Sequence, residues 1–423
     1  MARAERGGRV NALVLAGGAA RGAYEVGVVD YILHDVARAI GKTPDLDILC
    51  GTSVGAINAC VVGAHLATPE TCRTVLVNEW QGLRLDEIVR ANTGELVRLF
   101  SGVVGRGGTR PSGSARRGGF LDPRGIEGIV RRAIPFGQIG ENLAAGRLLG
   151  LTISTTHLVS GSTVIFVQHA PTATPRWSRD PTIAVQTTTL EPHHALASYA
   201  LPLMFPAVHI DGEFFCDGGL RQNVPLSPAR RLGANGLIVV NPRFVAPATL
   251  DGGGYVRPDS PRPREPHAAP PSQLFVLGKA LNALLLDRID NDLDRLKRIN
   301  AILDAGTHRF GPTFLEAVNA ELGHGDASSG VRSLSVVHVR ASEDIGRLAA
   351  TYVRSPDFLR RAPGMVGALL RRIGEWDSEG EADLLSYLLF DGDFASHLID
   401  LGRKDAKSRH EELCAFFMRE GSV

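Results

Sequence analysis

The sequence has almost no net charge. It contains 46 Lys and Arg residues against 45 Asp and Glu, which leaves a formal net charge of +1 over 423 residues. Proteins that bind nucleic acid through a broad surface carry a clear excess of positive charge. The balance argues against that class, and we expect no nucleic-acid partner.

Cysteine is scarce and lacks the spacing of a metal site or a disulfide framework. The count is odd, no two cysteines stand in CxxC spacing, and no HxxxH pattern or carboxylate cluster suggests a catalytic metal. We therefore expect neither a metal nor another cofactor. Reduced thiols suit a cytoplasmic protein. The five cysteines are Cys50, Cys60, Cys72, Cys216 and Cys414.

Long hydrophobic runs are also missing. No stretch approaches the roughly eighteen apolar residues of a transmembrane helix. The first nine residues, MARAERGGR, are charged and lack the apolar segment of a Sec signal peptide. We expect residues 1–9 to be disordered and the protein to be cytoplasmic. Peripheral contact with a membrane, and export by a route that needs no such signal, remain open alternatives.

What the sequence does contain is a regular alternation of strands and helices. Hydrophobic residues make up 44% of the chain, enough for a sizeable core. Residues 10–16 and 46–50 are predicted strands. Residues 23–40 show helical spacing of apolar side chains, and residues 56–64 are a predicted buried helix. Two strand–turn–helix units in succession favour a parallel sheet in an α/β fold.

The rest of the chain is predicted to join the same domain. Residues 244–271 are rich in proline and glycine, but a domain boundary there would leave the late strand at 331–339 without a sheet. We therefore predict one domain over 10–417, with a core at 10–243, a surface excursion at 244–273 and a helical part at 274–417. Further strands are expected at 148–155, 162–168 and 237–240, helices at 122–133 and 275–303, and a Gly-, Ser- and Arg-rich loop at 101–119.

A serine between two glycines stands where the second strand passes into its helix. This is the context of a nucleophile elbow, whose sharp turn lifts the hydroxyl above the sheet and directs the helix N-terminus at any oxyanion formed there. We predict that Ser53 is a nucleophile. The elbow motif comprises Gly51, Thr52, Ser53, Val54 and Gly55.

A serine nucleophile needs a base, and Asp217 is the strongest candidate. It follows an apolar stretch and precedes Gly218 and Gly219. A charged carboxylate at the edge of an apolar segment costs free energy, which favours a functional role for it. The alternative is a simple turn, because Asp-Gly is also a hairpin signal. The thirteen histidines offer no clear partner. A conventional Ser-His-Asp hydrolase would need a late histidine beside Ser53, such as His308, His324 or His338.

The glycine-rich turn after the first strand is a predicted oxyanion hole, because backbone N–H groups on such a turn converge on an anion. It is not a GxGxxG fingerprint, since Ala19 takes the third position, and no Walker lysine follows. Arg21 would orient this loop, meet a phosphate headgroup or form a simple salt bridge. The predicted residues are Gly17, Gly18, Ala19, Ala20, Arg21 and Gly22.

Taken in order, the blocks at 17–22, 51–55 and 217–219 resemble the patatin-like phospholipase family. Residues 197–206 resemble its SxAxPxxFP stretch, and Asn223-Val224-Pro225 resembles its NxP. The helical segment 396–406 resembles the close of many bacterial members. The likeness is strong over 10–243 and weaker to about 410.

The resemblance implies a three-layer α/β/α fold with a central, mostly parallel sheet and C-terminal helical decoration. It implies a Ser53–Asp217 dyad without histidine that hydrolyses ester bonds of phospholipids or other acyl lipids without metal. The family usually has three consecutive glycines where this chain has Ala19 third. Alanine keeps the N–H group and would clash only if φ is positive there, so we expect it to be tolerated.

Several alternatives remain at this point. The same sequence features are compatible with a Ser-His-Asp esterase, with a non-catalytic lipid-binding module, and with an enzyme that passes the acyl group to an acceptor other than water. The expected partners are a phospholipid or acyl-lipid substrate and, transiently, a membrane surface, while the oligomeric state stays open. Side chains that would contact an acyl chain, or belong to the core, are Leu201, Leu203, Met204 and Phe205.

Overall fold

A computed structural model describes most of the chain. The described residues are 9–85, 123–173, 175, 177, 180–202, 204–245, 249–250, 256–257, 289–322, 330–362, 367, 370–371 and 379–419. The predictions for residues 1–8, for the loop at 101–119, for most of the excursion at 244–273, for Leu203 and for His324 lie outside these ranges.

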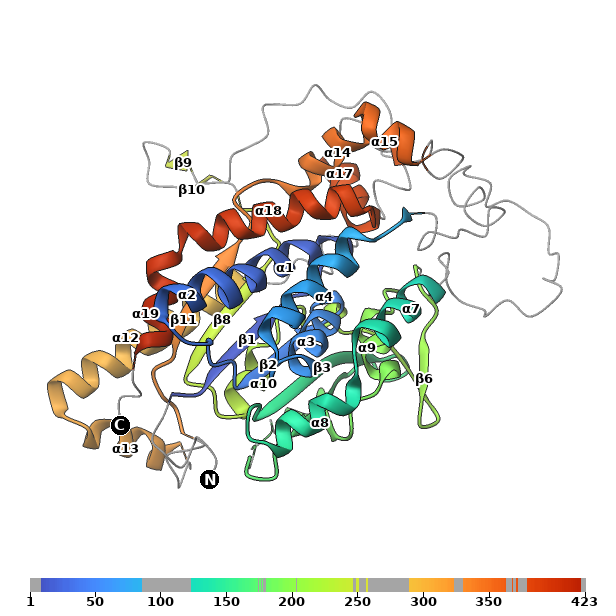
Figure 1. Cartoon of the computed structure of the whole chain (residues 1–423). Coiled ribbons are helices and arrows are strands. Elements are labelled where there is room, and N and C mark those ends of the chain that lie inside the picture. The colour runs from blue at the N-terminus through green and yellow to red at the C-terminus, as the bar shows by residue number, and fades with distance from the viewer. Residues whose placement is uncertain are drawn as a thin grey trace.

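A nine-stranded sheet forms the centre of the described structure (Figure 1). Its main path runs β11-β8-β1-β2-β3-β4-β5, and every neighbouring pair is parallel except β3 with β4. This is the mostly parallel sheet that the alternating pattern predicted. The strands are β1 (Asn11–Leu15), β2 (Ile48–Thr52), β3 (Gly150–His157), β4 (Thr163–His169), β5 (Ile183–Thr187), β6 (Val208–Ile210), β7 (Glu213–Asp217), β8 (Gly236–Asn241) and β11 (Ser335–Arg340).

Two strands share one flank of β3. β2 pairs with β3 as far as Thr52, opposite Ser154, and β4 occupies the other flank. β7 comes from the opposite direction, antiparallel to β3, and its last residue, Asp217, lies opposite Thr155. The ends of β2 and β7 therefore meet at neighbouring positions of β3. β6 pairs with the outer side of β7.

Helices cover both faces of the sheet and complete three layers. In β1, Leu13 and Leu15 join the larger apolar cluster, while Ala12 and Val14 join the smaller one. This period-2 alternation between two buried faces explains why the central strands are apolar throughout. The larger cluster lies under α1 (Gly22–Tyr31), α3 (Val54–Ala64), α4 (Pro69–Gln81), α8 (Phe136–Ala144), α9 (Pro192–Tyr199), α14 (Ile345–Val353), α17 (Glu379–Leu388), α18 (Gly392–Ser408) and α19 (His410–Met418), and the smaller one under α10 (Leu226–Arg231) and α12 (Ile289–Phe310).

Several element boundaries differ from the expected ones. The helix predicted over 23–40 runs through α1, a π-helical turn at Ile32–Val36 and α2 (Ala37–Ile40), and it ends at Gly41 with φ +70° as glycine allows. The helix predicted to end at 303 continues through Gly306 to Phe310 and ends where Gly311 adopts φ +83° and Pro312 follows. The strands β5, β6 and β7 were not predicted, since they are short and only partly apolar.

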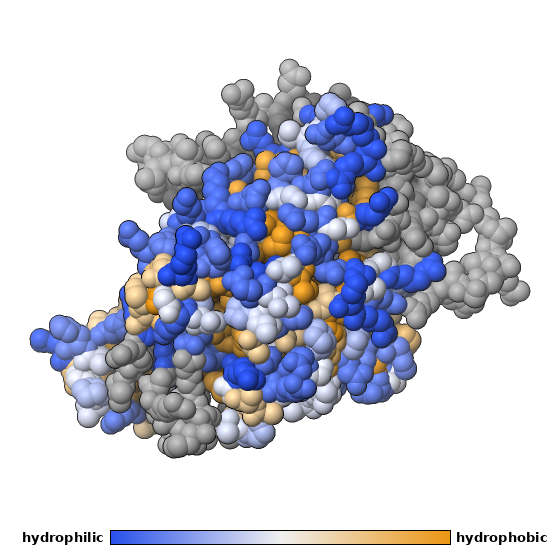
Figure 2. Space-filling view, in the orientation of Figure 1, coloured by the Kyte–Doolittle hydropathy of each residue, from blue (hydrophilic) through white to orange (hydrophobic). Residues whose placement is uncertain are grey.

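The C-terminal helices are an integral layer of the fold. Figure 1 shows α18 running alongside α1. Glycines make this approach possible, since a Cβ on Gly27 would lie 2.0 Å from the Ile399 carbonyl oxygen and one on Gly402 would lie 2.1 Å from that of Tyr24. On the outer face of these helices, hydrophilic residues prevail and hydrophobic ones show in smaller patches between them (Figure 2). No described helix combines the length and the apolar character needed to cross a bilayer.

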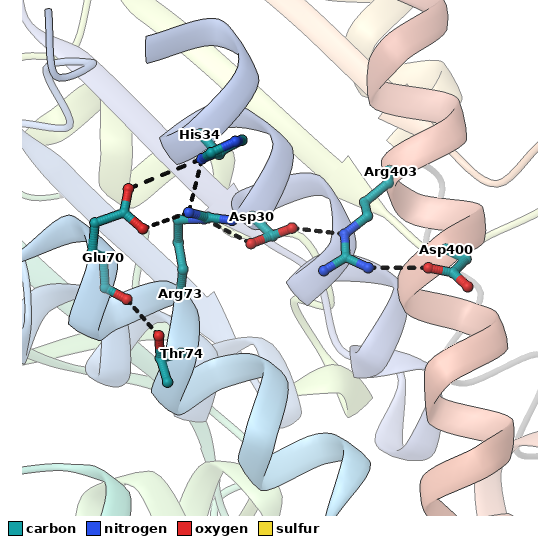
Figure 3. Close-up of polar contacts among 7 residues, drawn as sticks. All are labelled: Asp30, His34, Glu70, Arg73, Thr74, Asp400 and Arg403. Atoms are coloured by element: carbon teal, nitrogen blue, oxygen red, sulfur yellow. Dashed lines mark hydrogen bonds and ion pairs between the residues drawn. The ribbon is translucent and has the colours of Figure 1, made fainter. Parts of the chain in front are cut away.

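A buried carboxylate ties three of these helices together (Figure 3). Asp30 of α1 accepts a hydrogen bond from Arg73 Nε of α4 at 2.8 Å and from Arg403 Nε of α18 at 2.6 Å. Its side chain is only 6% exposed, whereas Glu70, the second acid that Arg73 contacts, is 76% exposed. Asp30 is therefore the central counter-charge of this cluster.

Asp30→Asn should lower the free energy of unfolding by about 2 kcal/mol, because Arg73 and Arg403 would lose their shared buried counter-charge and keep only the exposed acids Glu70 and Asp400. Urea unfolding followed by circular dichroism measures the change. Glu70→Gln is the matched control, and its exposed pair should contribute less than about 0.5 kcal/mol. Equal losses in both variants would contradict the central role of Asp30.

Candidate active site

Ser53 stands on a sharp turn between β2 and α3. Its backbone adopts φ 55° and ψ −129°, a strained conformation for a residue with a side chain. The flanking glycines are required by space. A Cβ on Gly51 would lie 2.4 Å from Ala56 Cα, and one on Gly55 would lie 2.5 Å from the Leu15 carbonyl oxygen. The predicted elbow geometry is therefore present at this position.

The end of β7 brings a carboxylate to the serine. Ser53 Oγ donates a hydrogen bond to Asp217 Oδ2 at 2.6 Å, and the amide of Gly219 donates to Oδ1 at 2.7 Å. Gly218 lets the chain leave the sheet here, because a Cβ would lie 2.2 Å from the Ser154 carbonyl oxygen. The Asp-Gly-Gly sequence thus forms a turn, and the same turn holds the carboxylate against Ser53.

Asp217 is buried, with 1% of its surface exposed. Burial raises the pKa of its carboxyl group to about 7, and the hydrogen bonds from Ser53 and Gly219 only partly oppose this shift. A carboxylate with a pKa near neutrality is a much better proton acceptor than an exposed aspartate. The arrangement is therefore chemically suited to proton transfer from Ser53 to Asp217 without a histidine.

Ser198 holds the turn from the other side, a function that sequence reasoning did not assign to it. Its Oγ accepts a hydrogen bond from the Ser53 amide at 2.8 Å and donates one to the Ser154 carbonyl at 2.6 Å. This hydroxyl fastens the strained turn to β3. The available signal was its place in the SxAxPxxFP-like stretch.

The glycine-rich loop lies directly against the serine. A Cβ on Gly17 would lie 3.1 Å from Ser53 Cβ and 2.2 Å from Asn223 Oδ1. The Gly17 amide donates to the Asn223 carbonyl at 3.1 Å, so Asn223 positions the start of the loop. From the sequence alone, Asn223 stands out only as part of the NxP motif that resembles the family.

Not every amide of the loop is available to an oxyanion. Besides Gly17, the amide of Arg21 donates to Gly18 O at 3.0 Å and that of Gly22 donates to Ala19 O. No hydrogen bond between described residues uses the amides of Gly18, Ala19 or Ala20. The six predicted residues therefore reduce to three candidate donors.

Ala19 adopts the left-handed conformation that glycine favours. Its φ is +48°, which costs a residue with a Cβ about 1–2 kcal/mol. Positive φ is the condition under which the substitution was expected to clash, and the surrounding fold holds the residue in it nevertheless. The usual third glycine of the family would relieve this strain.

The side chain of Arg21 contacts α17. Its guanidinium contacts Asp383 Oδ1 at 2.8 Å, donates through Nε to Ser386 Oγ at 2.8 Å, and lies 4.1 Å from the centre of the Tyr387 ring. The side chain is 5% exposed. Of the three roles considered for Arg21, these contacts favour orientation of the loop through a buried salt bridge.

Of the late histidines considered for a conventional triad, the two that the structure describes, His308 and His338, are not at the serine. His308 lies in the last turn of α12 and His338 in β11, three strands from β2 in the sheet. His194, in α9, has its pKa lowered to about 4, chiefly by burial. Among the hydrogen bonds that the described residues make with one another, none joins a histidine to Ser53 or Asp217.

Leu201, Met204 and Phe205 belong to the core, each with 5% of its surface exposed. Their packing favours the core interpretation over contact with an acyl chain. In the described part of the chain, no group of three or more His, Cys, Asp or Glu residues is arranged to hold a metal ion.

Comparison with known proteins agrees with the motifs. The model of the family described as patatin-like phospholipase matches residues 13–230, slightly more than half of the chain. No curated protein shows significant similarity. Among solved structures, the crystal structure of VipD from Legionella pneumophila is 12% identical, covering 93% of this chain and 67% of that one with a TM-score of 0.28, a likeness that carries no argument. On the family match, the chain belongs to the patatin-like phospholipases, a family of lipid-ester hydrolases.

Proposed function

We propose that the protein hydrolyses carboxylic ester bonds of phospholipids or other acyl lipids, with Ser53 as nucleophile and Asp217 as its proton acceptor. The observation that carries this proposal is the 2.6 Å hydrogen bond from Ser53 Oγ to Asp217 Oδ2. The pKa of Asp217, raised by burial to about 7, supports its role as a base near neutral pH.

The proposed reaction has two steps. Ser53 Oγ attacks the ester carbonyl carbon while its proton passes to Asp217, and the amides of Gly18, Ala19 and Ala20 stabilise the oxyanion. Collapse breaks the ester bond, and the leaving alcohol takes the proton from Asp217. Water then gives a proton to Asp217 and attacks the acyl-Ser53 ester. The second collapse releases the fatty acid and returns the proton to Ser53.

The alternatives use the same scaffold differently. A Ser-His-Asp mechanism has no supporting histidine contact among the described residues. A non-catalytic lipid-binding module has no need of a strained serine hydrogen-bonded to a buried carboxylate. Acyl transfer to another acceptor uses the same two residues, so product analysis separates it from hydrolysis.

Ser53→Ala and Asp217→Asn should each lower kcat by about 10⁴-fold or more, because the nucleophile or its base is lost. A panel of lipids with products identified by mass spectrometry measures the effect and reports the ester cleaved. A fluorophosphonate probe should label Ser53 in the folded wild type only. Ser160→Ala, on an exposed turn, is the control. Wild-type turnover by Ser53→Ala would refute the mechanism.

The activity should depend on the protonation of Asp217. Below pH 7, kcat/KM should fall about tenfold per pH unit, because the protonated carboxyl group cannot accept the serine proton. Hydrolysis of a water-soluble ester between pH 4.5 and 9 measures the profile. Circular dichroism at each pH controls for unfolding. An acid limb centred near pH 4, the ordinary range of aspartate, would contradict the buried-base assignment.

We infer that the protein meets its substrate at a membrane surface through an apolar patch formed by Leu158, Val159 and Phe214. These side chains are 52%, 85% and 47% exposed. The Leu158 amide donates to the Phe214 carbonyl at 2.8 Å, which holds the two hairpins side by side. Phe214 precedes Asp217 on β7 by about 10 Å of strand. Exposed apolar groups this close to the proposed dyad suit transient insertion among lipids.

Replacing Leu158, Val159 and Phe214 together by serine should weaken binding to phosphatidylcholine vesicles at least tenfold, because the buried apolar area is lost. Vesicle flotation measures binding, and kcat/KM on a water-soluble ester should stay within twofold. The control variant replaces Ile302 and Phe310 of α12 by serine as well; these residues are 64% and 68% exposed. Equal loss of binding in the control would refute a specific patch.

The cysteines support a reducing compartment. All five are free thiols and buried. We infer that the protein works in the cytoplasm, at the periphery of a membrane.

A further inference from the structure

A pocket of about 450 Å³ lies on the side of the sheet covered by α10 and α12. It is bounded by the segment that follows Asp217, by the first residues of β4 and β5, and by one face of α12. The volume is in the range of small-molecule sites. Neither Ser53 nor Asp217 lines it, so it is distinct from the candidate active site.

One part of the pocket is apolar. Val224 and Leu226 contribute from the chain leading into α10, and Leu296 and Ile299 contribute from α12. Leu296 and Ile299 are three residues apart on the helix and therefore share a face. Two segments of the chain thus supply apolar lining that suits a hydrocarbon chain.

The other part of the pocket is cationic. Arg221, Arg230 and Arg295 line it together with one acid, Asp292. Arg221 donates to the Gly161 carbonyl at 2.7 Å and lies near Asp180. The side chains of Arg230 and Arg295 make no ion pair or hydrogen bond with any described residue. Two guanidinium groups that pair with no described residue therefore border the apolar part of the pocket, and Asp292 is the one acid in the lining.

Two further arginines, Arg231 and Arg332, lie near Arg230. Partial burial and the neighbouring Arg231 hold the pKa of Arg230 below its ordinary value. Arg332 donates to the carbonyl oxygens of Arg230 and Ala234 at 3.4 and 3.1 Å, and burial together with Arg230 lowers its pKa as well. An anion placed here would relieve this repulsion.

Gln222 connects the pocket to the proposed dyad. It lines the pocket, its carbonyl accepts a hydrogen bond from Thr52 Oγ1 at 2.9 Å, and its Oε1 accepts one from Ser154 Oγ at 3.3 Å. Thr52 directly precedes Ser53. A single residue thus lines the pocket and contacts the strand ends that carry the dyad.

We propose that this pocket binds an anionic amphiphile with one hydrocarbon chain, whose carboxylate or phosphate pairs with Arg230 and Arg295 and whose chain lies between the α10 segment and α12. Arginine binds either anion through paired hydrogen bonds. A fatty-acid anion, which the proposed reaction releases, and a phosphorylated single-chain lipid share this chemistry. The proposal rests on the pocket alone and does not require Ser53 to be the nucleophile.

The test is calorimetric titration of the full chain with dodecanoate and, separately, with dodecyl phosphate, both below their micelle concentrations. The protein is first treated with a fluorophosphonate so that the site at Ser53 is blocked, and mass spectrometry reports the labelling. We expect one bound amphiphile per chain. Dodecanol should bind at least tenfold more weakly than the better anion, and inorganic phosphate alone should not bind measurably.

The double variant Arg230→Gln and Arg295→Gln should weaken binding at least tenfold, because each lost charged hydrogen bond contributes about tenfold. The matched control is Arg298→Gln with Arg309→Gln, two exposed arginines of α12 that do not line the pocket. Thermal unfolding of both variants verifies the fold.

The anion that binds with the lower Kd indicates whether the ligand is a fatty acid or a phosphorylated single-chain lipid. No measurable binding of either anion to the blocked protein, or binding that the pocket double variant leaves intact, would overturn the proposal. Absence of phosphonate labelling would count against the proposed hydrolase instead, and it would leave the titration of the pocket interpretable.

Discussion

The ends of β2 and β7, meeting on one side of β3, are the constraint on which the rest of the site depends. β2 leaves β3 after Thr52, opposite Ser154, and β7 arrives from the other direction to place Asp217 opposite Thr155. Ser53 and Asp217 follow from this register, because each is the residue at or just beyond the end of its strand. The hydroxyl of Ser198 secures the junction by bonding the Ser53 amide and the Ser154 carbonyl. A shift of β7 by one residue would turn the carboxylate to the other face of the sheet.

Two buried aspartates show how surroundings decide what a carboxylate does. Asp30 receives two arginines and joins α1, α4 and α18. Asp217 receives only a serine hydroxyl and a backbone amide, so burial is not offset by a positive charge and the pKa rises to about 7. The first arrangement suits a structural counter-charge, and the second suits a proton acceptor.

The C-terminal helices contribute to the site as well as to the core. α17 binds the guanidinium of Arg21 through Asp383, Ser386 and Tyr387, and this anchors the loop whose amides at Gly18, Ala19 and Ala20 carry no other bond to a described residue. The strain at Ala19, with φ +48°, is held in the same way by its surroundings. On the far side of the sheet, Gln222 relates the arginine-lined pocket to the same strand ends. The loop, the dyad and the pocket thus all lie near the end of the sheet at which β1, β2 and β7 finish.

Short-range features of the sequence determined the α/β class, the elbow around Ser53, the loop at 17–22 and the helix end at Gly41, because glycine placement and apolar spacing act within a few residues of each other. The resemblance of the three motifs, in their order, to the patatin-like family also implied that Ser53 and Asp217 belong together. Only the tertiary structure decided which loop amides stay unbonded, that Arg21 turns toward α17, and that Ser198 and Asn223 hold the turn and the loop. It alone decided that three arginines line a pocket between α10 and α12. Those outcomes depend on strand register and helix packing between segments hundreds of residues apart, which no local pattern encodes.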